Sequence, residues 1–121
     1  VNDKELLTLA AKAYWGDEIN DVCSIRWLDK DECIGYMHGD NQDHNGRDVE
    51  LVWNPLEFDY DAFRLMVVCK LHIGLESHVV SAWHKDRFGH YFAEAFGDGD
   101  HCEATRRAIV RAAAAIGKAM P

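Results

Sequence analysis

The pattern of apolar and polar positions is clearest near the end of the chain, where alanine dominates the stretch Ala104–Met120. Alanine favours helix because it loses no side-chain entropy on ordering. Asp100 with Glu103 three residues later is typical of a capping box. At a period of 3.6 residues, one face of the predicted helix holds Ile109, Ala113, Ile116 and Met120, and the opposite face holds Arg107, Arg111 and Lys118. We expect the first face to join a core and the second to meet solvent or a partner.

Two more helices are predicted upstream. Asn2 and Glu5 have the spacing of a helix start, and Trp15-Gly16 ends the apolar stripe made by Leu6, Leu9, Ala10 and Ala13. Pro55 disfavours helix at the residue before it, so a boundary falls there. A second helix over Asp59–Lys70 should follow, with a core-facing side made by Phe63, Met66 and Val67.

The first half of the chain also predicts a β-hairpin. Its strands are Cys33–His38 and Val49–Trp53, joined by the very polar connection Gly39–Asp48 with its tight-turn signal Asn45-Gly46. A further short strand is possible at Cys23–Leu28.

Three short strands are predicted in the second half, over Leu71–Leu75, His78–Trp83 and His90–Phe96, with turns at Glu76-Ser77 and Asp86-Arg87. Alternation places one mostly aliphatic set on the face that should receive the helices: Leu71, Ile73, Leu75, Val80, Ala82, Tyr91, Ala93 and Ala95. The other face collects His72, Val79, Ser81, Trp83, His90, Phe92 and Glu94. If this second face is uncovered, Trp83 and Phe92 form an interface patch; if the N-terminal hairpin covers it, they are core.

These elements predict one α+β domain over residues 1–121, in the order α-ββ-α-βββ-α. Helices would pack on an antiparallel sheet made of the N-terminal hairpin and the three-stranded meander.

Charge narrows the classes of partner. The net charge is -8, and the acidity lies in the first half: residues 1–53 hold five Lys or Arg and twelve Asp or Glu, against eight and nine in residues 54–121. Non-specific phosphate binding depends on Lys and Arg, so such a chain is a poor candidate for it. The acidic stretch Asp17–Glu50 would suit a basic partner.

The cysteines and the hydropathy of the chain indicate which cellular compartment we expect for the protein. The four cysteines, Cys23, Cys33, Cys69 and Cys102, would allow two disulfides in three connectivities. Without a secretory signal pattern, we expect reduced thiols in a cytoplasmic protein. No apolar run reaches the ~18 residues of a membrane span.

Three segments carry a resemblance to a known family. They are Asp3–Leu7 with Leu9–Ala13; Trp53–Leu56 with Asp59, Asp61, Ala62, Arg64 and Leu65; and Ala104–Ala114. In this order they resemble a family of small bacteriophage and prophage proteins of unknown function. A looser similarity is to the phage α-β-α sandwich type of domain. The resemblance implies a phage accessory protein acting in the cytoplasm of an infected bacterium, and it brings no catalytic residue with it.

A second likeness concerns topology alone. From Asp59 onward, the order α-β-β-β-α is similar to a double-stranded-RNA-binding domain, in which a Gly-rich loop precedes a basic last helix. Here Gly97 and Gly99 precede a helix carrying Arg106, Arg107 and Arg111. The chain departs from that pattern because acids stand where lysines are expected: Asp98, Asp100 and Glu103.

The sequence contains only weak signals of a catalytic or metal-binding site. The loop Asn41–Gly46 resembles a calcium loop, but Asn41 and Val52 occupy the first and twelfth positions, which need Asp and Glu. Five histidines gather in the second half without the close spacing of metal ligands: His72, His78, His84, His90 and His101. Ser81 with His84, and Cys102 with His101, are neighbours in sequence, which is no sign of a catalytic dyad. We therefore predict no catalytic, cofactor or metal site, and no enzyme.

The best functional hypothesis is a binding module that engages a host or phage protein, for example against host defence. The candidate interaction residues are Trp83, Phe92, Arg107, Arg111 and Lys118. The alternatives are nucleic-acid binding through the basic face of the last helix, and a small ligand held in a pocket beside the sheet. Association of copies of the chain is left open.

Overall fold

The computed structural model describes residues 2–16, 22–84, 92–96 and 99–121. The predicted turn at Asp86-Arg87, together with His90 and Asp98, lies outside these ranges. The elements follow the predicted order, and the short strand suggested at Cys23–Leu28 is present as β1. They are α1 (Asp3–Trp15), β1 (Val22–Leu28), β2 (Cys33–Gln42), β3 (Asp48–Trp53), α2 (Asp59–Val68), β4 (Leu71–Leu75), β5 (Val79–His84), β6 (Phe92–Ala95) and α3 (His101–Ala119).

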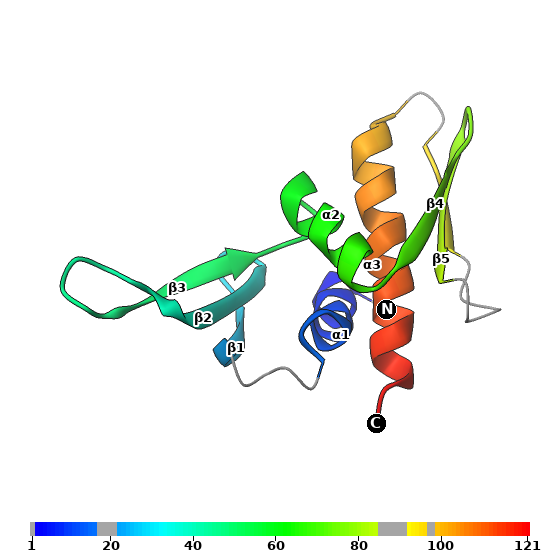
Figure 1. The fold of residues 1–121 in the computed structure, drawn as a ribbon. Helices are drawn as coiled ribbons and strands as arrows, with labels where there is room; N and C mark the ends of the chain where they lie inside the picture. Colours follow the sequence, from blue (N-terminus) through cyan, green and yellow to red (C-terminus); the bar gives the residue numbers. More distant parts are fainter. Residues whose placement is uncertain (1, 17–21, 85–91, 97–98) are drawn as a thin grey trace.

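The strands form two separate antiparallel sheets, in the orders β1-β2-β3 and β4-β5-β6. The predicted α+β class is confirmed, but the single sheet is not. Figure 1 shows the helices between the two sheets: the second sheet lies along α3, and the ribbon of β2 and β3 extends away on the other side. The N-terminal strands therefore do not cover the second sheet.

Helix α3 is the centre of the fold. Its N-cap Asp100 accepts hydrogen bonds from the N–H groups of Cys102 and Glu103, at 2.9 and 3.1 Å. One side packs on Val80 and Ala82 of the second sheet, through its alanines Ala104, Ala108 and Ala112. Another side packs against α1 and α2, through Ile109, Val110 and Ala113. Because α3 is covered on several sides, alanine serves here for close approach as well as for helix formation.

The closest approach is between α1 and α3, at Gly117. A Cβ atom on this residue would lie 1.9 Å from the carbonyl oxygen of Leu9. The same end of the helix pair is joined by Lys12, whose Nζ donates to the carbonyl oxygen of Met120 at 2.9 Å. Both the N-cap Asn2 and the left-handed Gly16 (φ 51°) bound α1 as predicted.

An aromatic cluster attaches the first sheet to the helices. Tyr14 and Trp15 end α1, and their rings lie 5.3 and 5.1 Å from that of Trp53 on β3. Trp15 also lies 5.1 Å from Tyr36 on β2. Ring pairs at these separations add to the stability gained from burial. The tight turn predicted at Asn45-Gly46, between β2 and β3, is confirmed. The Asp43 side chain accepts a hydrogen bond there from the N–H of Asn45 at 2.8 Å.

The boundary predicted at Pro55 is a hydrogen-bonded turn. Asp61 accepts from the N–H of Asn54 at 2.9 Å, and the Asn54 side chain accepts from the N–H of Leu56 at 3.1 Å. Burial raises the pKa of Asp61, and the Asn54 N–H opposes this shift by stabilising the carboxylate. Arg106 of α3 donates to the carbonyl oxygen of Leu56 at 2.9 Å, so the turn is fixed to the central helix.

The predicted core face of α2 is wrong for two of its three residues. Ala62 and Leu65 are the buried side chains, and Met66 is half-buried against them. Phe63 is 60% exposed and Val67 is 56% exposed. Apolar residues occupy nearly every position from Ala62 to Val68, so periodicity alone does not select a face. The small side chain of Ala62 lets α2 approach α3, and this selects the face that is buried.

The second sheet corrects the predicted phase of its last strand. Ala82 pairs with Phe92, and Val80 pairs with Glu94, so both β6 residues lie on the face that receives α3. Trp83 lies on the opposite face, half-buried, with its ring stacked 5.7 Å from that of His72. Side chains alternate along a strand, so a shift of one residue turns every side chain to the other face. Trp83 and Phe92 therefore do not share a patch.

The contact at Gly117 predicts a stability effect. The Gly117→Ala substitution should lower the free energy of unfolding by about 3 kcal/mol, because the added methyl group overlaps the Leu9 carbonyl oxygen and α1 has to move. Thermal unfolding followed by circular dichroism should show a loss of roughly 10 °C. Gly46→Ala is the comparison: its Cβ would meet no atom within 4 Å, so only its φ of 76° opposes alanine, and we expect the smaller loss of about 1 kcal/mol. An unchanged Tm for Gly117→Ala would contradict the close packing.

Candidate protein-binding surface

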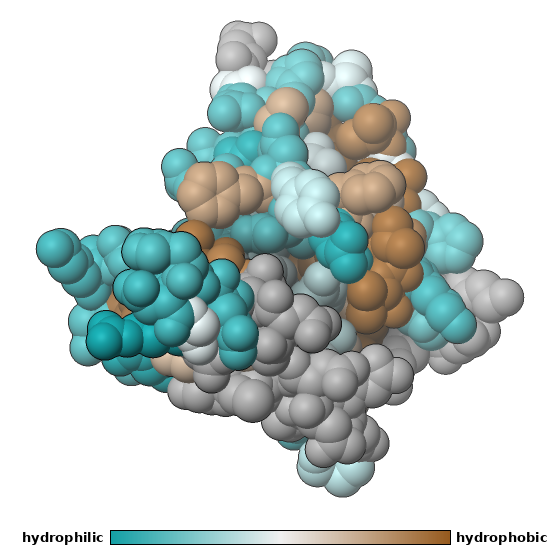
Figure 2. Space-filling model, turned by 60° about the vertical axis from the view of Figure 1, so that its left-hand side comes forward, coloured by the Kyte–Doolittle hydropathy of each residue, from teal (hydrophilic) through white to brown (hydrophobic). Residues whose placement is uncertain are grey.

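An apolar groove of about 470 Å³ lies between α2, β4 and the first half of α3. Apolar residues from these elements, and one that directly follows β6, line most of it: Ala62, Phe63, Met66, Ile73, Leu75, Phe96 and Ile109. Figure 2 shows apolar residues gathered in a band on this side of the molecule, beside a strongly hydrophilic region. We refer to this feature as the α2–β4 groove.

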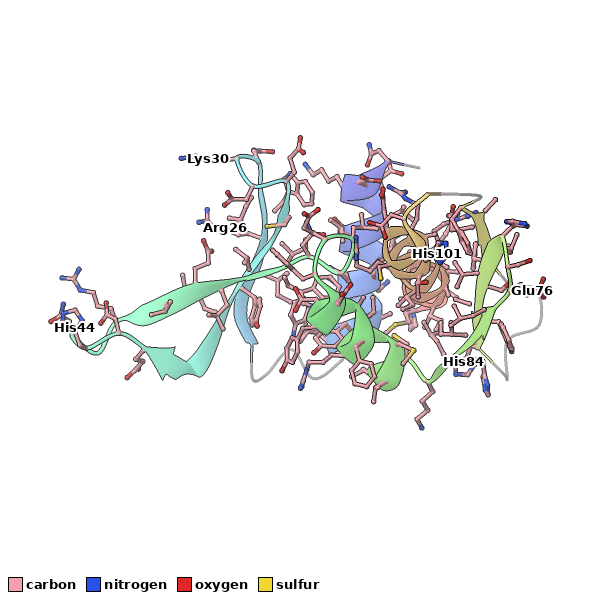
Figure 3. The ribbon with its side chains drawn as sticks, turned by 90° about the horizontal axis from the view of Figure 1, so that it is seen from above. Arg26, Lys30, His44, Glu76, His84 and His101 are labelled. Carbon is pink, nitrogen blue, oxygen red and sulfur yellow. The ribbon has the colours of Figure 1, made fainter. Side chains whose placement is uncertain are left out.

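Large apolar side chains on the walls of the groove are exposed to solvent. Phe63 stands on the outer side of α2, and Leu75, at the end of β4, is 73% exposed. The tight turn after β4 fixes Leu75, because the N–H of Glu76 donates to the carbonyl oxygen of Val79 at 2.9 Å. Seen from above in Figure 3, α2 and β4 flank the same side of α3. The ring of His101 lies 4.1 Å from that of Phe96, both residues lining the groove.

The rim of the groove is acidic. Asp59 and Glu76 line it, and both are exposed. Arg106 also lines it, but its side chain is only 15% exposed and donates to Asp59 at 2.8 Å as well as to the Leu56 carbonyl. The largely buried guanidinium offsets part of the charge of Asp59, whose side chain is 76% exposed, and Glu76 adds a second carboxylate, so the rim carries a net negative charge.

Two further aromatic residues are exposed around the start of α2. Phe58 is 48% exposed and Tyr60 is 68% exposed, with the Arg64 guanidinium 5.5 Å from the Tyr60 ring centre. Isolated exposed apolar residues are ordinary on a soluble protein, whereas a contiguous group marks an interaction site.

A larger cleft, of about 920 Å³, borders the other side of the Asn54–Phe58 turn. Carboxylates from three parts of the chain line it: Asp3, Asp31, Glu32 and Glu57. Its cation is Lys4, whose Nζ lies 5.7 Å from the centre of the Trp27 ring. The acidity predicted for the first half therefore reaches the turn that precedes α2.

The predicted basic residues line a different concavity, of about 580 Å³. The structure brings Phe92, Arg107, Arg111 and Lys118 together there, beside Leu6 and Leu9 of α1. Arg107 donates to Asp3 at 3.1 Å. Arg111 donates to Glu94 at 2.6 Å and lies 5.1 Å from the centre of the Phe92 ring. Of the five predicted interaction residues, Trp83 stands apart from this group.

The order α2-β4-β5-β6-α3 is the one that resembles a double-stranded-RNA-binding domain. Its three arginines, however, each pair with a carboxylate of the chain: Arg106 with Asp59, Arg107 with Asp3, and Arg111 with Glu94. Contact with phosphate would require these pairs to open, and the N-cap Asp100 would face the same phosphates. The arrangement disfavours nucleic acid.

The residues that could bind a metal ion or react as thiols do not form one site in the described part of the chain. Within the part of the chain that the structure describes, no three His, Cys, Asp or Glu side chains converge as a metal site. Cys33 and Cys69 are free and buried, and Cys102 is free and exposed in the first turn of α3. Burial raises the pKa of the Cys69 thiol to about 11. Among the described helices, none is both long and apolar enough to cross a membrane.

Comparison of the chain with models of protein families, with curated proteins and with solved structures finds no match.

Sequence reasoning missed the residues of the α2–β4 groove. The apolar pattern predicts Phe63 in the core, whereas it is 60% exposed on a wall of the groove. Leu75 does lie on the predicted face, opposite Val80, but at the end of β4 it is 73% exposed. The available signal was α2 itself, whose apolar residues are too many for one buried stripe of a short helix.

The environment of the thiols predicts selective labelling. At pH 8, a maleimide should modify Cys102 at least about a hundredfold faster than Cys69, because the Cys69 thiol is buried and its thiolate is suppressed. Peptide mapping by mass spectrometry gives the rates at the two positions. In guanidinium chloride the two rates should converge. Equal rates in the native protein would contradict the packing of α2 on α3.

Proposed function

We propose that this chain is a non-enzymatic protein-binding module that engages its partner through the α2–β4 groove. The observation that carries the proposal is the exposure of large apolar side chains on both walls, at Phe63 and Leu75. Burying such side chains drives most protein association, and aromatic residues are enriched where two proteins meet. In the short helix α2, Ala62 and Leu65 are buried in the core, while Phe63, Val67 and Val68 are exposed and available to a partner.

The resemblance to phage and prophage proteins extends the proposal to origin and place. We propose an accessory protein of that kind, acting in the bacterial cytoplasm on a host or phage protein. In support, residues of the resembling segments serve the scaffold, as in the Asp61–Asn54 hydrogen bond and the contact of Arg106 with Leu56. Phe63 and Leu75 lie outside those segments. A shared scaffold with its own groove residues suits proteins that bind different targets.

Photo-crosslinking in bacterial cells tests the proposal. With benzoylphenylalanine in place of Phe63, irradiation should join the chain to a specific bacterial or phage protein, because the side chain would be buried in the interface. Adding Leu75→Lys should reduce that product about tenfold, while leaving stability within ~0.5 kcal/mol because Leu75 is exposed.

The control is benzoylphenylalanine at Ile25, an exposed apolar residue of β1 that is far from the groove in sequence and belongs to the other sheet. The same products from both positions, or none from position 63, would count against a binding role for the groove.

The nucleic-acid alternative makes its own prediction. Because Arg106, Arg107 and Arg111 are paired with carboxylates and the net charge is -8, we expect no retardation of duplex RNA or DNA in a gel, even at low salt. Retardation that decreases steeply with salt, and that Arg107→Ala with Arg111→Ala removes, would favour nucleic acid over protein as the partner.

A further inference from the structure

Strand β4 is an exposed sheet edge that lacks the usual protection. Among the described strands it pairs with β5 alone, and the pairing runs without a bulge from Leu71 opposite His84 to Leu75 opposite Val80. Its sequence, Leu-His-Ile-Gly-Leu, holds no Pro, Lys, Arg, Asp or Glu. Such an edge presents unpaired N–H and C=O groups in a straight row, to which another strand can bind.

The other three edge strands of the described sheets each carry a protective feature. The pairing of β1 is interrupted between Cys23 and Arg26, and Arg26 forms an ion pair with Glu50 of β3 at 2.7 Å. The pairing of β3 with β2 is also irregular, and β6 holds the charged Glu94. Bulges and charges of this kind discourage strand addition.

The groove lies beside this edge, and residues of β4 line it. Ile73 and Leu75 alternate along β4 and both line the groove, while Phe63 and Met66 line it from α2. Figure 3 shows α2 and β4 flanking α3, and residues of all three elements line the groove. A strand paired with β4 would direct every second side chain toward this apolar space.

We propose that the α2–β4 groove binds an extended segment of the partner protein, which adds to β4 as a further strand. Alternate side chains of this segment are apolar and fill the groove, and Lys or Arg residues lie among them, because the rim carries Asp59 and Glu76. This inference rests on the proposed protein-binding function. The net charge of -8 on every copy disfavours a second copy of the chain as the occupant.

Three blocked synthetic peptides test the binding mode. The first alternates charge and apolar residues (Lys-Val-Lys-Ile-Lys-Val-Lys), the second has the same composition at helical spacing (Val-Lys-Lys-Ile-Val-Lys-Lys), and the third replaces each Lys of the first by Glu. At physiological salt, the first should bind the full chain with a Kd on the order of 100 µM. It should slow amide hydrogen exchange within residues 71–75 about tenfold, because their outward groups become hydrogen-bonded.

The matched variants are Leu75→Lys on β4 and Ile25→Lys on β1. We expect Leu75→Lys to weaken binding of the first peptide at least about tenfold, since a charged edge disfavours strand addition, and Ile25→Lys to leave it unchanged. Stronger binding of the helical isomer, equal binding of the acidic peptide, or no exchange protection at residues 71–75 would overturn the strand mode. So would a concentration-dependent dimer that Leu75→Lys dissociates.

Failure of this inference is distinguishable from failure of the proposed function. If crosslinking from position 63 persists while the alternating peptide gives no protection at β4, the groove binds protein in another manner. If benzoylphenylalanine at position 63 gives no specific crosslinked product, both this inference and the proposed function are wrong.

Discussion

The close approach of α1 and α3 at Gly117 is the constraint on which the rest of the structure depends. With no side chain at this position, the Leu9 carbonyl oxygen comes within 1.9 Å of where a Cβ would stand. The pair of helices then offers two surfaces. One carries Tyr14 and Trp15, which hold the first sheet through Trp53, and the other is the alanine face of α3, which receives the second sheet.

The same arrangement leaves α2 only partly covered. The central helix α3 is occupied by α1 and the second sheet, and α2 contributes to its cover mainly through Ala62 and Leu65. Met66 packs partly on the same core, but Phe63, Val67 and Val68 are exposed in the described chain. The space between α2 and β4 stays open as a groove. Exposing Phe63 and Leu75 costs free energy in water, and binding a protein there recovers it.

The charge that the groove presents to a partner depends on which groups the arginines of α3 contact. Arg106 fixes the turn before α2, Arg107 reaches Asp3 at the start of α1, and Arg111 meets Glu94 on β6. Each of these cations is engaged in joining elements of the fold. The surface around the groove and the neighbouring cleft is consequently dominated by carboxylates, and a partner segment with Lys or Arg among apolar residues complements it.

The sequence by itself determined the α+β class, the element order and where the helices begin, because caps, turns and alanine content act locally. Asn2, Asp100 and the Asn54-Pro55 boundary are confirmed for this reason. It also located the acidic excess. Tertiary structure alone decided that the strands form two sheets, that Phe92 faces α3 while Trp83 does not, and that Phe63 is exposed. Which side chains of a strand face the core depends on how the strand packs against other elements. The same holds for the buried face of a helix that is apolar on all sides. The local pattern of apolar residues does not determine either of them.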